Sequence, residues 1–273
     1  MKSILCIFSI LLLQMPNVVY TQKINPFLFH DNNLKSLTGP VLSQAQLDSL
    51  VTSIGKRKID FTKEDWQKII DAYWGAGITA NEELAIFDDY WKRIDEQFAC
   101  FRGIDVDWDS VKATYRPEIE TGVSRGRFAA ILTHMADQLM DAHTYAHDTL
   151  IEATFPDPNV PVFWVNGSYL KNRFGAGLTP LADSSLLVYV ALNDQPLGLQ
   201  PGDRILGYDN QSWHSIYTKL IDDELPMVIH NTGSTHESFY HLFMRSAGNN
   251  WHLFDTIDIV KYHQTDTIHL PTT

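Results

Sequence analysis

Apolar residues recur with the spacing of α-helices from about residue 43 to residue 148. Hydroxyl residues that can cap a first helical turn stand at Thr62, Thr79 and Ser124, and Gly75 ends the first of these helices. Each start is followed by one apolar face: Trp66, Ile69, Ile70, Tyr73 and Trp74; then Phe87, Tyr90, Trp91, Ile94 and Phe98; then Phe128, Ile131, Leu132, Met135, Leu139 and His143. These faces predict a helical bundle whose core is largely aromatic.

The pattern changes after Pro156 and Pro158. Strand-like runs, several of them alternating or β-branched, cover Pro161–Val165, Leu186–Leu192, Ile205–Tyr208, Trp251–Val260 and Thr267–Leu270. Two helices interrupt these runs, one from Ser212 to about Asp222 and one that begins at a predicted capping box at Ser234. The predicted fold class is therefore α+β: a helical domain (residues 43–150) followed by a small β-barrel or sandwich with two helices (residues 155–273).

The first residues have the features of a secretory signal peptide. Lys2 precedes an apolar run over residues 4–13, which is too short to span a bilayer stably. Val19 and Thr21 fit the positions before a cleavage site, so residues 1–21 are the expected signal peptide and residues 22–42 a linker. An uncleaved N-terminal anchor is the alternative. The expected location is secreted or periplasmic, without membrane insertion after cleavage.

Charge and cysteine content narrow the classes of partner. The formal net charge is −12 at pH 7, and removal of the signal peptide would take away one lysine and no acid. A surface of this sign disfavours nucleic acid and anionic membranes. Cleavage would leave Cys100 as the one cysteine, so we expect no internal disulfide and a fold that depends on core packing. No cofactor is expected.

A chemically specific turn lies at residues 198–206, Gly-Leu-Gln-Pro-Gly-Asp-Arg-Ile-Leu. Pro201 presets φ, Gly202 can take the positive φ of a type II turn, and Asp203 can accept hydrogen bonds from backbone amides. This sequence resembles the strand-entry turn of PDZ domains, especially those of bacterial proteases, and the order of elements resembles a circularly permuted PDZ domain. PDZ domains bind polypeptide ends, so the resemblance implies a polypeptide substrate or a C-terminal peptide as the partner.

A candidate peptide-binding loop precedes the strand near Leu186. It comprises Phe174, Gly175, Ala176, Gly177 and Leu178. Glycines let consecutive amides converge on a terminal carboxylate, and the peptide would then add a strand to the sheet edge. An ordinary Gly-rich turn is the alternative. Farther on, Asn210 stands in a turn where PDZ domains usually carry Asn-Gly, and because Asn tolerates the left-handed conformation, we still expect a hairpin.

The helical half carries a second resemblance. Its motifs are Phe87-x-x-Tyr90-Trp91-x-x-Ile94-x-Glu96-x-Phe98, Asp107-Trp108-Asp109-x-Val111, Tyr115-Arg116-Pro117 and Leu139-Met140-Asp141-Ala142-His143-Thr144-Tyr145. In this order they resemble the N-terminal helical domain of tail-specific (C-terminal processing) serine peptidases, in the secreted, tricorn-core-like branch. In that family a PDZ domain follows. The resemblance covers about residues 85–270 and implies the substrate-recognition part of a secreted peptidase.

The same resemblance gives His143 the role of general base toward a serine in a later catalytic core, with Asp141 or Asp148 orienting the imidazole. Ala142 stands where tricorn-like sites can carry a serine, and in Lys-dependent relatives this histidine would be structural. A structural helix-end histidine therefore remains an open alternative. His143 and His147 are also spaced to share a helical face and bind Zn²⁺, but Thr144 replaces the glutamate of a hydrolytic zinc helix, so no metal is expected.

The nucleophile is not expected within these residues. Ser168 and Ser246 each have a glycine nearby, but neither stands in the Gly-rich strand-to-helix elbow that a nucleophilic serine needs. In the peptidase family the catalytic core follows the PDZ domain. We therefore expect this chain alone not to hydrolyse peptides. The alternative function is a stand-alone, non-catalytic, secreted peptide-binding protein.

Overall fold

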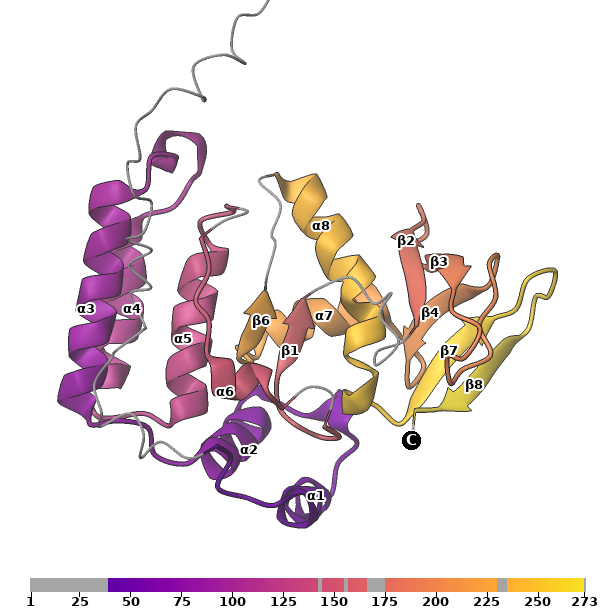
Figure 1. Cartoon of the computed structure of the whole chain (residues 1–273), viewed down its shortest axis with the longest axis horizontal. Helices are drawn as coiled ribbons and strands as arrows, with labels where there is room; N and C mark the ends of the chain where they lie inside the picture. The colour runs from indigo at the N-terminus through magenta and orange to yellow at the C-terminus, as the bar shows by residue number, and fades with distance from the viewer. Residues whose placement is uncertain (1–38, 142–143, 155–156, 166–174, 230–234, 273) are drawn as a thin grey trace, which may run out of the picture. The chain divides into compact units, whose positions relative to one another are not determined.

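The computed structural model describes residues 39–141, 144–154, 157–165, 175–229 and 235–272, and its α-helices and most of its strands are labelled in Figure 1. The first part is helical: α1 (Gln44–Ser53), η2 (Lys58–Asp60), α2 (Lys63–Trp74), α3 (Ala80–Gln97), η3 (Phe101–Gly103), α4 (Trp108–Glu120), α5 (Arg125–Asp137) and α6 (Thr149–Glu152). Strands and helices then follow: β1 (Phe163–Val165), β2 (Ala176–Pro180), β3 (Leu186–Ala191), β4 (Arg204–Tyr208), β5 (Gln211–Ser212), α7 (Trp213–Asp222), β6 (Met227–Ile229), α8 (His236–Arg245), η4 (Ser246–Asn249), η5 (Trp251–Leu253), β7 (Thr256–Val260) and β8 (Thr267–Pro271). The predicted α+β class is confirmed. The predicted signal peptide lies outside the described residues.

Hydroxyl caps begin the helices where the sequence predicts them. Thr62 caps α2, and the carboxylate of Asp65 accepts the Thr62 backbone N–H at 3.0 Å, which completes a capping box. Thr79 and Glu82 form the same box at the start of α3, and Ser124 caps α5. Each cap satisfies backbone N–H groups that the helix leaves unpaired. The cap of α8 is Thr235, one residue after the predicted Ser234, which lies outside the described residues.

The two helices α3 and α4 are joined by a reciprocal tryptophan contact. The indole N–H of Trp91 donates to the carbonyl of Trp108 at 2.9 Å, and that of Trp108 donates to the carbonyl of Trp91 at 3.0 Å. Lys112 lies 4.1 Å from the centroid of the Trp91 ring, a cation–π contact. The predicted aromatic face is thus core, and its polar N–H groups are paired inside it.

Helix α5 is shorter than the periodicity predicts. The apolar stripe runs on to Leu139 and His143, but the helix ends at Asp137. Leu139 is fully buried without being helical. Residues 144–148 are not helical either, so the prediction that His143 and His147 share a helical face is wrong. Apolar spacing persists past the helix because the following segment also packs against the interior.

The main sheet is antiparallel, with the strand order β2-β3-β4-β7-β8 and with β5 paired to β4. Within the described residues it has two ends, β2 and β8, and is not a closed barrel, which corrects part of the fold prediction. The predicted strand Trp251–Val260 is shorter, because residues 251–253 form the 3-10 turn η5 and β7 starts at Thr256. The structure also contains strands β2 and β6, which the sequence pattern did not predict.

A second, small sheet pairs β1 and β6 in parallel, with Trp164 opposite Val228. The side chain of Asn250 completes the other side of β1: Trp164 N donates to its Oδ1 at 2.9 Å, and its Nδ2 donates to the Trp164 carbonyl at 2.9 Å. One buried amide side chain therefore occupies the backbone positions that a further strand would use.

Helix α5 is fastened to the segment that leads into β6. His134 Nε2 lies 2.9 Å from the carbonyl of Leu225, and Met227 N donates to Thr133 Oγ1 at 3.3 Å. Glu224 makes ion pairs with Arg127 at 2.6 Å and with Lys63 at 3.0 Å. Burial lowers the pKa of His134 to about 4, so this histidine is neutral at physiological pH.

Candidate functional site

The Pro-Gly-Asp turn is held by one buried carboxylate. Asp203 is 1 % exposed, and its side chain accepts from Gln200 N at 2.9 Å, Tyr262 N at 2.9 Å and Lys261 Nζ at 2.8 Å. Burial raises its pKa, but these bonds outweigh burial and hold the pKa below its usual value. Gly202 has φ of 97°, and a Cβ there would lie 2.7 Å from the Tyr262 ring. The motif therefore fastens the start of β4 to the β7–β8 connection.

The turn after β4 also uses positive φ and a carboxylate. Asp209 and Asn210 have φ of 50° and 67°, as a type I′ hairpin requires, which confirms the predicted hairpin. Asp258 on β7 accepts from Asn210 N at 2.7 Å. Asp209 in turn accepts from Thr256 N at 2.8 Å. The sequence identified the hairpin but not the distant carboxylates that support it.

The candidate peptide-binding residues lie at one end of the main sheet. Phe174 is outside the described residues, and Gly175 has φ of 73° and accepts a hydrogen bond from Leu192 N at 2.8 Å. The sequence predicted a loop for Ala176, Gly177 and Leu178, but in the structure these residues belong to strand β2. β2 pairs with β3 and with no other strand that the structure describes. The predicted residues thus form an edge strand.

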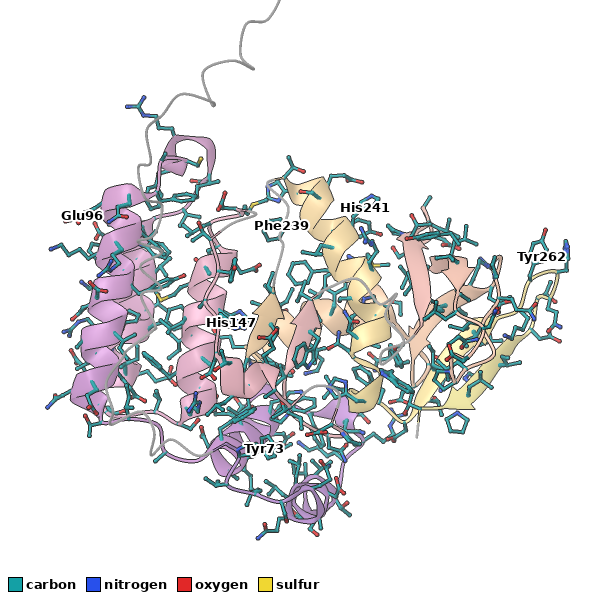
Figure 2. The ribbon with its side chains drawn as sticks, viewed as in Figure 1. Tyr73, Glu96, His147, Phe239, His241 and Tyr262 are labelled. Carbon is teal, nitrogen blue, oxygen red and sulfur yellow. The ribbon has the colours of Figure 1, made fainter. Side chains whose placement is uncertain are left out.

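Helix α8 contacts β2. Its inner side chains Phe239, Phe243 and Met244 are buried in the core. Figure 2 labels Phe239 and His241 on this helix, and His241 Nε2 lies 2.9 Å from Glu237 Oε1 on the exposed side. An edge strand beside an amphipathic helix is an arrangement that can accept an extended peptide.

The next predicted site residue is the candidate general base, His143. His143 and its neighbour Ala142 lie outside the described residues. Of the acids predicted to orient it, Asp141 accepts from Thr144 Oγ1 at 2.8 Å. Asp148 makes two 2.9 Å bonds to Arg125 and caps α6. Asp148 is therefore committed to Arg125 and to the α6 backbone.

A second acid, which sequence reasoning missed, lies near the end of α5. Burial raises the pKa of Asp137 to about 7, and among the described residues its Oδ1 has no hydrogen-bond partner. It lines a small cavity with Thr133, Thr144 and Ile229, among others. An acid at a helix C-terminus meets the negative end of the helix dipole, which also disfavours its ionised form. The sequence pattern around Asp137 is that of an ordinary apolar helix face, so it did not indicate that this acid is buried without a hydrogen-bond partner for Oδ1 among the described residues.

The other predicted residues have structural contacts. His147 Nε2 lies 3.0 Å from Glu152 Oε2. Ser246 is buried and donates to the Phe243 carbonyl at 2.6 Å, so it is a helix-end residue and not an exposed nucleophile. Ser168 lies outside the described residues. Within the part of the chain that the structure describes, no group of three or more His, Cys, Asp or Glu residues is arranged to hold a metal ion.

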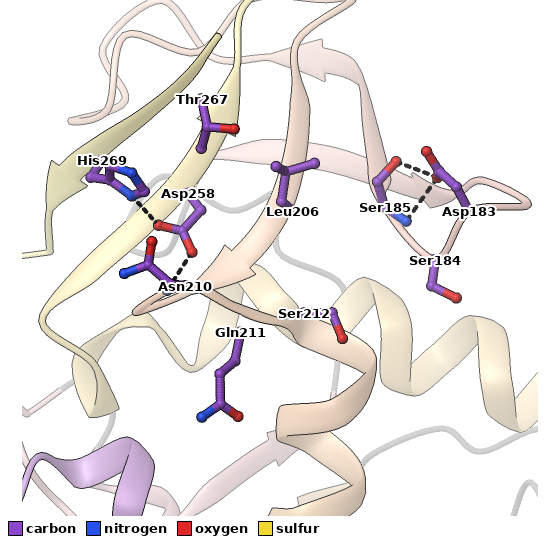
Figure 3. A pocket seen from close by; sticks show the side chains of 10 residues that line it. All are labelled: Asp183, Ser184, Ser185, Leu206, Asn210, Gln211, Ser212, Asp258, Thr267 and His269. Carbon is purple, nitrogen blue, oxygen red and sulfur yellow. Dashed lines mark hydrogen bonds and ion pairs between the residues drawn. The ribbon is translucent and has the colours of Figure 1, made fainter. Parts of the chain in front are cut away.

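A polar hollow of about 380 Å³ lies on the main sheet (Figure 3). Its lining residues are Asp183, Ser184, Ser185, Leu206, Asn210, Gln211, Ser212, Asp258, Thr267 and His269. His269 Nδ1 lies 2.6 Å from Asp258 Oδ1, and the two residues are cross-strand partners. In Figure 3, Ser184 and Ser185 stand on the other side of the hollow from His269. The arrangement is a cross-strand pair and not a serine–histidine–carboxylate relay.

The comparisons with known proteins bear on the helical part. The family model described as the tricorn protease C1 domain matches residues 79–137, from the cap of α3 to the end of α5. This match supports a relationship to tricorn and tail-specific proteases, and it includes three of the four motifs on which the resemblance rests. A search of curated proteins gives no match. None of the described helices is long and apolar enough to cross a membrane.

Proposed function

We propose that this chain is the substrate-recognition part of a secreted, tail-specific type of serine peptidase. In this proposal a PDZ-like unit binds polypeptide ends along β2, and the helical part supports it. The single observation that carries the proposal is that β2 pairs with β3 and with no other strand among the described residues, and that α8 contacts it. The tricorn protease match over residues 79–137 supports a protease-related role for the chain.

The physical basis of recognition is main-chain pairing. A strand at the edge of a sheet presents backbone N–H and C=O groups to a second polypeptide. A peptide that pairs with β2 would place its side chains alternately on the face of Ala176 and Leu178 and on the face of Gly177, and all three of these residues are buried. Gly175, with its positive φ, sets the direction of the chain just before β2. Affinity then comes from the backbone and selectivity from the side chains.

In this proposal the nucleophile that hydrolyses the peptide lies outside this chain. In this proposal His143 would act as general base to a serine outside residues 1–273, and these residues alone are not expected to hydrolyse peptides. Replacement of His143 by Ala should then change only stability in this chain. Peptide hydrolysis by the purified chain that the substitution abolishes would overturn this part of the proposal. Secretion through cleavage after Thr21 is part of the same proposal.

Binding is tested with labelled peptides of two chemistries. Fluorescein-labelled peptides with mixed apolar C-terminal residues would be titrated with the purified protein, once with a free C-terminal carboxylate and once as the amide. We expect the amide to bind at least tenfold more weakly, because the terminal charge is lost. Equal affinity for the two forms, or no binding of either, would contradict the proposal.

The alternative is a stand-alone, non-catalytic, secreted peptide-binding protein. The contacts of β2 and α8 fit it equally well, since they concern binding alone. Intact mass spectrometry of the protein captured from its source separates the two. A species well above the 31.1 kDa of this chain indicates a peptidase with a further core, and a species slightly below it favours the binding protein.

A further inference from the structure

The polar hollow on the main sheet is separate from the proposed peptide site. Its volume of about 380 Å³ lies within the usual range of small-molecule sites, roughly 300–1,000 Å³. Leu206 of β4 lies in its middle, with Thr267 and His269 on one side and Ser184 on the other (Figure 3). None of its lining residues belongs to β2. A ligand in the hollow would therefore bind independently of a peptide at β2.

A bulge in β4 shapes the floor of the hollow. The register of β4 against β7 shifts between Ile205 and Gly207, so Leu206 is the extra residue. A bulge redirects side chains, and here Leu206 lines the hollow while Ile205 is fully buried in the core. At Gly207 a Cβ would collide with the carbonyl oxygen of Gln211. Glycine at this position therefore lets the β4–β5 hairpin close one end of the hollow.

Several side chains of the hollow retain hydrogen-bonding capacity. Four of them carry an uncharged hydroxyl or amide group that bonds to no other described side chain or backbone group: Ser184, Asn210, Gln211 and Thr267. Each of these groups can both donate and accept a hydrogen bond. They come from the β2–β3 turn, the β4–β5 hairpin and β8, so they surround the floor on several sides (Figure 3).

The carboxylates of the hollow are already paired within the protein. Asp258 is 3 % exposed and accepts from Asn210 N at 2.7 Å, and His269 Nδ1 lies 2.6 Å from its Oδ1. Because a carboxylate can only accept, Nδ1 of His269 carries a hydrogen, and Nε2 is the ring nitrogen left for a ligand. Asp183 is paired with Arg204 at 3.2 Å. The hollow thus offers neutral donors and acceptors and no uncompensated charge.

We propose that this hollow binds one neutral sugar unit. A pyranose carries neighbouring hydroxyl groups that each donate and accept, so one ring can bond to several of the uncharged side chains at once. The C–H face of such a ring would pack on Leu206. A peptide amide brings one donor and one acceptor and would leave most of these groups without a partner. The formal net charge of −12 disfavours acidic sugars.

The test is a ¹H–¹⁵N NMR titration of the purified chain. The probes are free glucose, galactose and mannose, their methyl glycosides as models of a sugar linked into a chain, and glucuronate and glucosamine as charged sugars. We expect a saturable shift of the backbone amides of residues 210–212 with at least one neutral sugar. Gln211→Ala and Thr267→Val should each weaken its binding about two- to tenfold, the usual worth of one hydrogen bond. Thr265→Val, at an exposed position outside the hollow, is the matched control and should leave the affinity unchanged.

The possible outcomes decide the proposal without touching the proposed peptide site. No saturable shift with any neutral sugar would overturn it, and so would tighter binding of glucuronate or glucosamine than of every neutral sugar. An equal loss of affinity in Thr265→Val and Thr267→Val would also contradict it. Ser184→Gly provides a further variant: it removes a hydroxyl without strain, because Ser184 has φ of 62°, and it leaves β8 intact. Unchanged affinity in all three hollow variants would likewise refute the site.

Discussion

The helical part and the sheet treat buried carboxylates in opposite ways. Glu83 of α3 is 1 % exposed and accepts from Val123 N at 3.3 Å, and no described residue bonds to its Oε1. Burial raises its pKa to about 7, against the smaller opposing effect of the Val123 N–H. Asp203 of the sheet is equally buried, yet its donors hold its pKa below the usual value. Burial alone thus does not decide the charge of an acid, since the number of donors around it does.

The difference follows from where backbone donors are available. Inside a helix each N–H group is already bonded to a carbonyl four residues back, so a buried acid there finds few donors. Turns and strand ends leave N–H groups unpaired, and Asp203, Asp209 and Asp258 accept from such groups. The sheet therefore uses carboxylates that accept backbone N–H groups as fasteners, and the pKa of Asp203 among them is lowered, whereas in the helical part burial raises the pKa of Glu83 and Asp137.

The largest effect expected from this comparison is the loss of Asp203. Asp203→Ala removes three accepted hydrogen bonds and leaves Lys261 with only its bond to the Gly198 carbonyl, which should lower the free energy of unfolding by about 3–5 kcal/mol at pH 7. Urea denaturation followed by fluorescence measures this loss. Arg204→Ala, which breaks the exposed ion pair with Asp183 and leaves the bonds of Asp183 to Ser185 intact, serves as the control and should cost less than about 1 kcal/mol. Similar costs for the two variants would contradict the comparison.

The pH dependence of the Asp203 contribution has a defined sign. Because the pKa of Asp203 is lowered in the folded state, its stabilisation is fully present above the ordinary carboxyl range and is lost as pH falls through the folded-state pKa. The difference in melting temperature between wild type and Asp203→Ala should therefore shrink below about pH 4. A constant difference between pH 7 and pH 3 would refute this.

Glu83 should show the opposite dependence at a somewhat smaller size. Its pKa is raised from 4.5 to about 7 in the folded state, so the folded protein keeps a proton that the unfolded chain loses, and stability falls as pH rises through this window. Glu83→Gln should stabilise the protein by about 2–3 kcal/mol at pH 8 and by much less at pH 4. Thermal unfolding at both pH values is the measurement.

The neighbouring Glu82 is the matched control for that variant. It caps α3 together with Thr79, whose side chain lowers the pKa of Glu82. Because the ionised form of Glu82 is the stabilised one, Glu82→Gln should give no gain at pH 8. A gain equal to that of Glu83→Gln would show that the effect is a general response to lost negative charge.

A smaller effect is expected where the helical part does pair its buried polar groups. Trp108→Phe removes the donation to the Trp91 carbonyl as well as part of the ring contact, and it should cost about 1–2 kcal/mol. Urea denaturation again provides the measurement. A cost below about 0.5 kcal/mol, the level of ordinary surface substitutions, would mean that the reciprocal contact contributes little.

The smallest effect is predicted for exposed ion pairs on the helices. Asp89 and Arg93 of α3 form an i,i+4 pair with N···O of 2.6 Å at the surface. Asp89→Ala should change the free energy of unfolding by less than about 0.5 kcal/mol, because solvent screens such pairs. A larger loss would show that surface charge, and not donor supply, separates the two regions.

Much of the fold could be predicted from the sequence. Thr62, Thr79 and Ser124 predicted the helix starts because capping depends on the residue itself, and Gly202 and Asn210 predicted turns because positive φ depends on residue type. Strand β2 was missed because Ala-Gly-Leu-Thr-Pro contains little of the β-branched and aromatic content typical of strands. The end of α5 was misplaced because Leu139 continues the apolar period although it packs outside the helix.

The site was less accessible than the fold. The sequence indicated that Asp203 accepts from nearby amides, but Lys261 and Tyr262 lie about sixty residues later, and only the sheet pairing brings them close. The position of Leu206 on the floor of the hollow likewise depends on a bulge, which a pattern of residue types does not reveal. Contacts between residues far apart in the sequence could therefore not be predicted, unless a local backbone requirement, such as a positive φ, pointed to them.

The amide of Asn250 has a consequence for the cooperativity of unfolding. It pairs with both backbone groups of Trp164 and also donates to the Ser246 carbonyl at 2.9 Å, and all three residues are buried. Asn250→Leu would remove this partner of the Trp164 N–H and C=O in the interior and should therefore lower the melting temperature, and an unchanged melting temperature would disprove this role. A single side chain thus couples β1 to the end of α8, so that the two should unfold together.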